Sequence, residues 1–347
     1  MTTVIATPDV QSRDSKLLLF APVAAAFAYP FLLKAFHAAV AAAAGRASFA
    51  AGVLLLLAIG VPILGLLLAS KLGQVEMPSA STILAKRLAL LTVAAAPLFT
   101  ASGVLLYMAG DPISDITLWV VLWSLVFVLM VKVSLSNSVA SSGEFVPVSA
   151  RLRVAHGIGA MAIVLLFLAL HLINHMAGLI GEAEHRRLMD IFRVLYRAKV
   201  LEPIVVALFL FQVGSGIALL WGYTRQKADW FRTLQIASGA YLIFFVLGHM
   251  NSVFFYARTF ADIPTDWNFA TGAPTGLIRD AWNIRLLPHY LLGVFFVLTH
   301  LVLGARVVAL AHGMDAAKAN RLANVGIALA AVVAVAILSG MSGLRIA

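Results

Sequence analysis

Seven of the nine histidines of this sequence lie between His156 and His300, six of them within long apolar runs. Two of them, His171 and His249, each lie slightly beyond the middle of a predicted membrane span, and these two spans run in the same direction. Their imidazoles are therefore expected to face each other at similar depth. Two neutral imidazoles at about 2 Å from a haem iron fill both axial positions, which suits one-electron transfer and prevents oxygen binding. The pair predicts a bis-histidine haem b with His171 and His249 as metal ligands.

The other histidines need not bind a metal. His156 lies fifteen residues before His171, on nearly the same helix face but about 22 Å away along the axis, so these two cannot share one ligand. A histidine inside a membrane bundle is often hydrogen-bonded to a neighbouring helix, and this structural interpretation is favoured for His37 and His175. A further group lies near predicted span ends, where solvation accounts for each imidazole: His156, His185, His289 and His312.

The composition identifies the scaffold that must position these residues. Apolar residues make up 62% of the 347 positions, charged residues only 12%, and the mean hydropathy is +0.98, which leaves too little polar surface for soluble domains. We therefore predict an all-α, polytopic transmembrane helix bundle that contacts the lipid bilayer. The absence of cysteine excludes iron–sulfur clusters, disulfides and a cysteine nucleophile in this chain. The formal charge of +10 indicates membrane anchoring and not nucleic-acid binding, because Lys and Arg cluster at the ends of apolar runs.

Long apolar runs separated by charge, Pro or Gly predict nine helices, at roughly 16–44, 48–70, 83–109, 115–136, 150–180, 203–223, 231–258, 284–312 and 321–343. Pro30 in the first run predicts a kink or a shorter span followed by an interfacial stretch. Leu188, Ile191 and Leu195 recur at helical spacing among arginines, so the segment 182–202 is expected to lie flat on the membrane surface.

The distribution of Lys and Arg predicts the orientation. Fourteen lie on the side of the N-terminus and ten on the other, which favours a cytoplasmic N-terminus in a bacterial inner membrane. The polar stretch 134–149 separates a four-helix N-terminal region (1–145) that holds one histidine from a five-helix, haem-binding bundle (146–347).

From Arg151 to the C-terminus, roughly 195 of the 347 residues, several features occur in a characteristic order. On the first helix of this region, His156 and Gly159 precede the pair His171-Leu172 and Asn174. On the fourth helix, Trp230, the pair Leu234-Gln235 and Gly239 precede His249. On two other helices, a residue at a ligand position is followed by glycine four positions later: Gln212 by Gly216, and His300 by Gly304. This order resembles the five-helix cytochrome b anchor subunit of succinate dehydrogenases and fumarate reductases, which carries two haems.

The resemblance implies a role for each matched position. His171 and His249 correspond to the ligands of the haem farther from the cytoplasmic face, with Ser238 and Gly239 on the same ligand helix as His249. Gln212 and His300 correspond to the ligands of the other haem. Because glutamine is a poor ligand for haem iron, we expect that second site to be lost or to be five-coordinate through His300 alone. Ile236 replaces the family's arginine after the Leu-Gln pair.

The resemblance also implies a function, electron relay between a redox partner subunit and quinone. Trp282, Arg285, His289 and Tyr290 are the residues best suited to a quinone pocket, although an interfacial belt has the same composition. The four N-terminal helices have no counterpart in the family. The alternative is a haem-free transporter, assembly or sensory subunit that keeps the fold, although the prolines of the first half have no equivalents in the second. An intramembrane hydrolase finds little support, because no metal-protease motif occurs.

Overall fold

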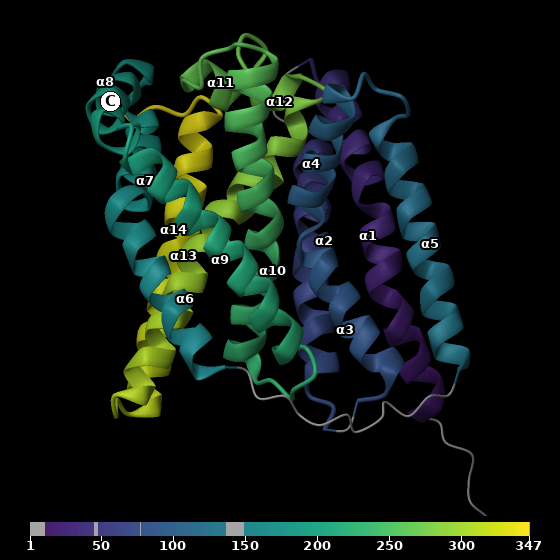
Figure 1. Cartoon of the computed structure of the whole chain (residues 1–347). Helices are drawn as coiled ribbons and strands as arrows, with labels where there is room; N and C mark the ends of the chain where they lie inside the picture. The colour runs from purple at the N-terminus through teal and green to yellow at the C-terminus, as the bar shows by residue number, and fades with distance from the viewer. Residues whose placement is uncertain (1–10, 45–47, 77, 137–148, 347) are drawn as a thin grey trace, which may run out of the picture.

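The computed structural model describes residues 11–44, 48–76, 78–136 and 149–346. Within these ranges the ordered elements are all helical, and no strand is present (Figure 1). Eight helices are long and apolar enough to cross a membrane, and a bent pair raises the number to nine. The prediction of an all-α polytopic bundle is therefore confirmed, with one of its nine predicted spans broken in two.

The first half consists of α1 (Gln11–Ala42), α2 (Phe49–Gly73), α3 (Ala80–Val93), α4 (Ala95–Met108) and α5 (Asp115–Leu135). The predicted span 83–109 is the bent pair α3 and α4, whose axes differ by 68°. Pro97 explains the bend, because proline has no N–H for the carbonyl of Val93 and its ring clashes with that carbonyl. The expected break at Pro30 is absent, since α1 continues through it to Ala42.

The second half contains longer spans built from consecutive helical segments. One span joins α6 (Ala150–Ile163), the π-helix η1 (Val164–Leu168), α7 (Ala169–Met176) and η2 (Ala177–Leu179), and another joins α10 (Trp230–Met250) to the π-helix η3 (Asn251–Phe260). The remaining elements are α8 (Glu182–Tyr196), α9 (Leu201–Tyr223), α11 (Trp267–Thr271), α12 (Gly276–Arg279), η4 (Asn283–Arg285), α13 (Leu286–Ala311) and α14 (Ala316–Met341).

Short polar side chains fix where the helices begin. A Ser or Asp side chain at the N-cap accepts a hydrogen bond from a backbone N–H of the first turn, which satisfies a donor that has no partner within the helix. This occurs at α2, α3, α5, α6, α10 and α14, with Ser48, Ser79, Ser114, Ser149, Asp229 and Asp315.

The two halves of the chain share one hydrophobic core. Tyr29, Phe99 and Trp119 of the first half belong to the same buried cluster as Tyr241 and Phe296 of the second. The boundary proposed from the sequence, between 145 and 146, lies outside the described residues. The division into two regions therefore remains a description of the sequence, while the described helices pack as one body.

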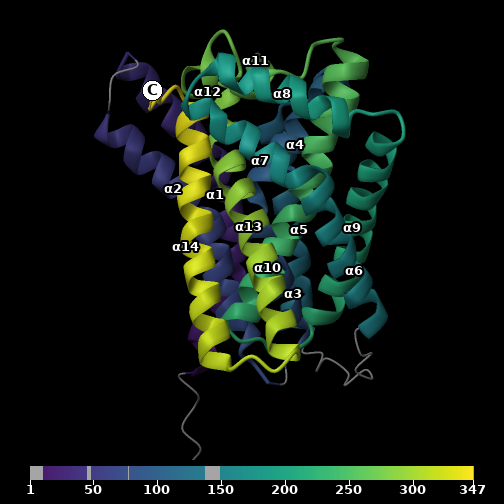
Figure 2. The same cartoon turned by 90° about the vertical axis from the view of Figure 1, so that its left-hand side faces the viewer.

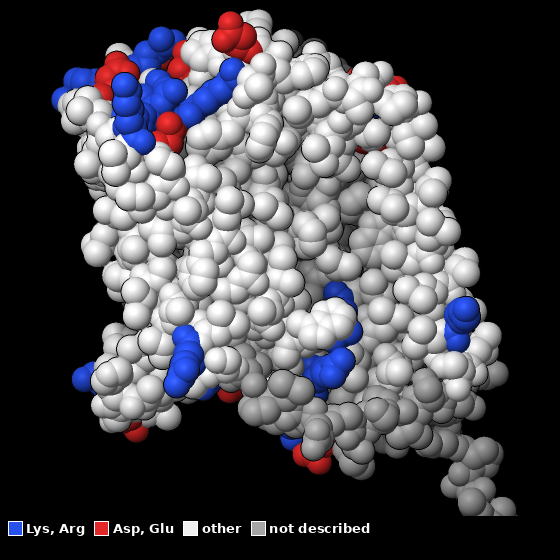
Figure 3. All heavy atoms as spheres, in the orientation of Figure 1, with Lys and Arg blue, Asp and Glu red and all other residues white. Residues whose placement is uncertain are grey.

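The charged residues lie mainly at the two ends of the bundle, with a broad uncharged surface between them (Figure 3). The segment predicted to lie flat on the membrane forms α8, which lies across one end of the bundle (Figure 2). Exposed apolar side chains such as Leu56, Val128 and Leu165 cover the middle of the surface. This distribution is that of an integral membrane protein.

Candidate functional site

A cavity lies between the second-half helices at the end of the bundle that α8 covers. Its volume is about 250 Å³, slightly below the roughly 300–1,000 Å³ of common small-molecule sites. Most of its wall is apolar. The polar and aromatic side chains that line it are Phe167, His171, Asn174, His175, His185, Arg193, Tyr196, Arg197, Glu202, Phe209, Phe245, His249, Phe254, Arg258, Thr265, Asp266, Phe269 and Tyr290.

His171 and His249 face each other across this cavity. Their ring centres are 6.1 Å apart and the ring planes make an angle of 70°. An iron ion between two imidazoles holds their ring centres about 6 Å apart, because each metal–nitrogen bond is about 2 Å and each nitrogen lies about 1 Å from its ring centre. The two rings therefore have the separation that a shared haem iron requires.

Two phenylalanines flank the paired imidazoles. The Phe167 ring stacks on His171 with centres 4.9 Å apart, and the Phe245 ring lies within 9° of parallel to His249 at 5.8 Å. Such contacts restrict the rotation of each imidazole about its side-chain bonds. Two π-helical segments, η1 and η3, lie next to the ligand-bearing turns, and π-turns often occur at functional sites.

His175 and His185 extend the row of imidazoles away from His249. The His175 ring centre lies 4.7 Å from that of His171 and 5.3 Å from that of His185. His185 is only 2% exposed and approaches Asn174 at 3.2 Å, so the expectation of a solvated His185 was wrong. Burial, and secondarily the nearby cation of Arg193, lower the pKa of His185 to about 4, which keeps it neutral at pH 7.

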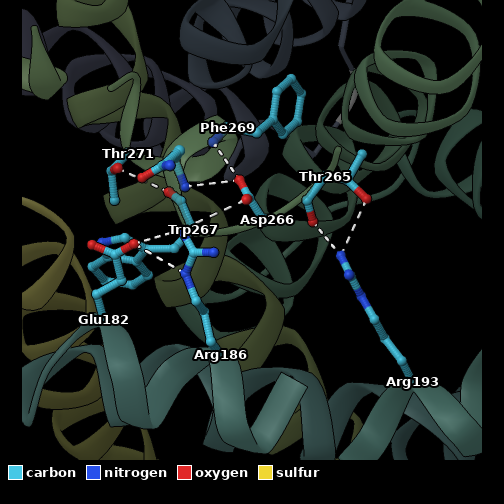
Figure 4. Close-up of polar contacts among 9 residues, drawn as sticks. Glu182, Arg186, Arg193, Thr265, Asp266, Trp267, Phe269 and Thr271 are labelled. Atoms are coloured by element: carbon cyan, nitrogen blue, oxygen red, sulfur yellow. Dashed lines mark hydrogen bonds and ion pairs between the residues drawn. The ribbon is translucent and has the colours of Figure 1, made fainter. Parts of the chain in front are cut away.

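Three arginines lie at the mouth of the cavity, next to α8. Arg193 donates to the backbone oxygen of Thr265 (Figure 4), and Arg258 pairs with Glu202 at 2.7 Å. The Arg258 Nε atom is buried without a hydrogen-bond partner among the described residues. Burial and the charges of Arg258 and Arg193 lower the pKa of Arg197. The positive charge here exceeds the negative charge, so the mouth favours a carboxylate-bearing ligand.

α8 is held at this end of the bundle by polar contacts with the loop before α13. Arg186 pairs with Glu182 of its own helix and approaches Asp266 at 3.9 Å (Figure 4). Asp266 also accepts hydrogen bonds from the first backbone N–H groups of α11. The His185 and Trp267 rings lie 4.6 Å apart beneath these contacts. The same helix therefore closes the cavity and presents its cations to it.

The remaining predicted site residues lie toward the opposite end of the bundle. Ser238 Oγ lies 3.0 Å from His300 Nδ1, and a Cβ atom at Gly239 would lie 3.2 Å from the His300 ring. Gln212 does not approach His300 in this manner; its amide nitrogen donates to the backbone oxygen of His156 at 2.9 Å. The imidazole opposite His300 belongs to His156, with ring centres 6.2 Å apart. The spacing in the sequence places His156 and His171 on one helix face. Spacing within one helix does not show which residue of another helix contacts His156, so His300 could not be identified as its neighbour.

The four residues expected at a quinone pocket form two adjacent pairs. Arg285 forms a buried ion pair with Asp115 at 2.7 Å, and its Nε donates to the Trp282 carbonyl oxygen. The His289 and Tyr290 rings lie 5.4 Å apart. His289 is only 4% exposed, which corrects the expectation that it is solvated, whereas Tyr290 lines the cavity. Of the four, Tyr290 is the one that lines the cavity together with the paired imidazoles. In the described part of the chain, no cluster of three or more His, Asp or Glu forms a conventional metal site.

Comparison of the chain with protein-family models, with curated proteins and with solved structures found no match.

Proposed function

We propose that this protein is an integral membrane b-type cytochrome that relays electrons, to or from quinone, through a haem held by His171 and His249. The observation that carries the proposal is the 6.1 Å separation of the two ring centres beside an apolar cavity. Bound there, the haem supplies a reversible one-electron couple, and two axial imidazoles favour electron transfer over oxygen chemistry.

The residues around the cavity fit a haem in four further ways. The two imidazoles come from different spans, so both axial positions are filled without rearrangement of one helix. Phe167 and Phe245 restrict the two rings. Arg193, Arg197 and Arg258 offer cations at the mouth, where the propionates of a haem would be neutralised and kept near the membrane surface. The apolar wall excludes water from the rest of the group.

The wider setting follows the resemblance to the succinate dehydrogenase and fumarate reductase anchors. We place the N-terminus on the cytoplasmic side of a bacterial inner membrane, so α8 and the cavity lie toward the opposite surface. Electrons are exchanged with quinone and with a redox partner subunit. Tyr290, which lines the cavity, is the residue of the expected quinone set best placed to contact a quinone.

The first test is a reduced-minus-oxidised absorption spectrum of the purified protein. We expect the bands of a b-type cytochrome, and we expect the contribution of the haem at this site to disappear in His171→Ala and in His249→Ala. The matched control is His175→Ala, one turn from His171, which should retain the haem. Equal losses in all three variants would refute the ligand assignment. A folded wild-type protein without any haem band would instead favour the haem-free transporter, assembly or sensory subunit.

A further inference from the structure

A second pair of imidazoles repeats the geometry of the first, toward the opposite end of the bundle. His156 of α6 and His300 of α13 have ring centres 6.2 Å apart, and their ring planes make an angle of 77°. The first pair, His171 and His249, shows 6.1 Å and 70°. A metal with an imidazole on each side requires about 6 Å. The second pair therefore has the same capacity to hold an iron between its rings.

Hydrogen bonds fix which nitrogen of each ring remains available. The Nδ1 atom of His156 lies 2.7 Å from Ser215 Oγ. The Nδ1 atom of His300 lies 3.0 Å from Ser238 Oγ and 3.2 Å from the Gln235 carbonyl oxygen. Over the described ranges, no hydrogen bond reaches the Nε2 atom of either ring. Histidine ligands of metals are commonly oriented in this way, with one ring nitrogen bonded to a neighbouring group and the other on the metal.

The helices around this pair also leave room for a flat cofactor. The plane of a porphyrin is perpendicular to the bond between the iron and an axial imidazole. The ring therefore extends past the ligand along its helix by about one turn. One turn after His300 stands Gly304, where an added Cβ atom would meet nothing within 4 Å. His156 and His300 are themselves only partly buried, so their rings are accessible from outside the packed core.

A direct contact between the two rings would also give this distance, because aromatic rings meet edge to face at about 4.5–7 Å. That contact would leave the Nε2 atom of each ring without a hydrogen-bond partner among the described residues. An unpaired polar group costs free energy to the extent that it is withdrawn from water. Coordination of iron removes this cost at both rings.

We infer that His156 and His300 are the axial ligands of a second haem b. This inference rests on the proposed function and extends it, since the two haems would lie one above the other along the span that carries both His156 and His171. Fifteen helical residues correspond to about 22 Å, most of the roughly 30 Å of a bilayer core. Electrons could then cross the membrane within this chain. Gln212, which occupies the position of the other ligand in the resemblance, instead donates a hydrogen bond to the backbone oxygen of His156.

The test is the ratio of haem to protein in the purified, full-length chain, measured as the pyridine haemochrome, together with the electron paramagnetic resonance spectrum. We expect two haems per wild-type chain, both low-spin. His156→Ala and His300→Ala should each lower the ratio to about one or convert one haem to a high-spin form. Gly304→Leu should lower the ratio without removal of a ligand. His312→Ala, at the exposed end of α13, is the control and should keep two low-spin haems.

The outcomes separate this inference from the proposed function. One haem per chain that is lost in His249→Ala and unaffected in His156→Ala and His300→Ala would overturn the second site and leave the first intact. A high-spin second haem that is indifferent to His156→Ala would also overturn it, because His300 would then act alone. Loss of only the second haem in His300→Ala, with the first haem retained, would support both. A wild-type chain without haem would refute both.

Discussion

The first five helices and the later ones use their apolar residues in different ways. In the first half, aromatic side chains fill the interior: Tyr29, Phe99 and Trp119 pack with ring centres 5.5 to 6.3 Å apart, and the Trp119 indole donates to the Ala26 carbonyl oxygen. In the second half, the corresponding space contains imidazoles and a cavity. Within the most apolar window of each span, 33% and 39% of the residues are buried in α1 and α2 and 17% in α5, against 11% to 22% in the spans of the second half.

This difference indicates that the first half supports the fold and that the second half holds the candidate site. A tightly packed bundle has no space for a cofactor, and a bundle with an internal cavity gives up packing energy unless a ligand fills it. The first half therefore acts as a rigid support against which α10 and α13 are held. The second half keeps its interior for groups that imidazoles can bind. Four predictions test this division, from the largest expected effect to the smallest.

The strongest link between the halves is the ion pair of Asp115 on α5 with Arg285 before α13. Arg285 is 8% exposed, so Asp115→Asn leaves a buried cation with a weaker partner. We expect destabilisation of about 2–4 kcal/mol, near the cost of breaking a buried pair. The measurement is the thermal unfolding midpoint in detergent. Glu182→Gln, which breaks the exposed pair with Arg186, should change stability by less than about 1 kcal/mol. Equal effects would show that the halves are not joined at Asp115.

The attachment of α8 should depend on pH through His185. Its folded-state pKa, about 4, lies below the ordinary value of 6.5, so the unfolded state binds more protons between these values. The stability contributed by neutral His185 is therefore complete above pH 6.5 and is lost as the pH falls toward 4, with a maximum of about 3 kcal/mol.

Hydrogen–deuterium exchange of α8 between pH 7.5 and 5 measures this dependence as a protection factor, the intrinsic amide rate at each pH divided by the observed rate. The protection factors of α8 should fall on acidification in the wild type and change much less in His185→Phe, which keeps an aromatic ring beside Trp267. The protection factors of the helices of the first half should stay constant. A fall of the same size in both proteins would contradict the assignment to His185.

Close packing in the first half should make it intolerant of a single methyl group. A Cβ atom at Gly65 would lie 2.8 Å from backbone atoms of Ala89 and Val93, which cannot move independently of α3. We expect Gly65→Ala to destabilise the protein by about 1–3 kcal/mol while the haem content stays unchanged. Gly60→Ala is the control, since nothing lies within 4 Å of the added atom, and it should be neutral or slightly stabilising. Thermal unfolding distinguishes the two variants.

The smallest effect is expected at the mouth of the cavity. Arg193→Gln removes a cation near the expected position of the propionates. The loss of this positive charge favours the oxidised haem, which carries one more positive charge than the reduced haem. We expect a lower midpoint potential, by on the order of 1 kcal/mol or about 40 mV for one electron. Arg187→Gln, whose partner is Glu184 on the exposed face of α8, should leave the potential unchanged. A potentiometric titration measures both, and an equal shift would contradict a specific role of Arg193.

The helical architecture could be predicted from the sequence because apolar runs of span length have few other stable structures in a membrane. The position of each span, and α8 as a separate amphipathic helix, follow from the same patterns. The bend between α3 and α4 is explained by Pro97. The continuity of α1 through Pro30 could not be predicted, because neighbouring helices can stabilise a helix around a missing hydrogen bond.

The candidate site could be predicted only in part. The proximity of His171 and His249 follows from two spans that run in the same direction with imidazoles at equal depth. The proximity of His156 and His300 depends on how α6 and α13 rotate about their axes, which neither hydropathy nor a resemblance to one family determines. The π-helix η1, between His156 and His171, further changes their angular relation from that of a uniform helix. Burial of His185 by Trp267 likewise depends on a loop that the helical patterns do not describe.

The central claim is that His171 and His249 hold one iron between them, and the electron paramagnetic resonance spectrum of the oxidised protein tests it most directly. We predict a low-spin ferric signal typical of two axial imidazoles in the wild type, and in His249→Ala the loss of one haem's share of that signal or its conversion to a high-spin signal. A purified, folded protein without ferric haem, or a low-spin signal that His249→Ala leaves unchanged, would contradict the claim.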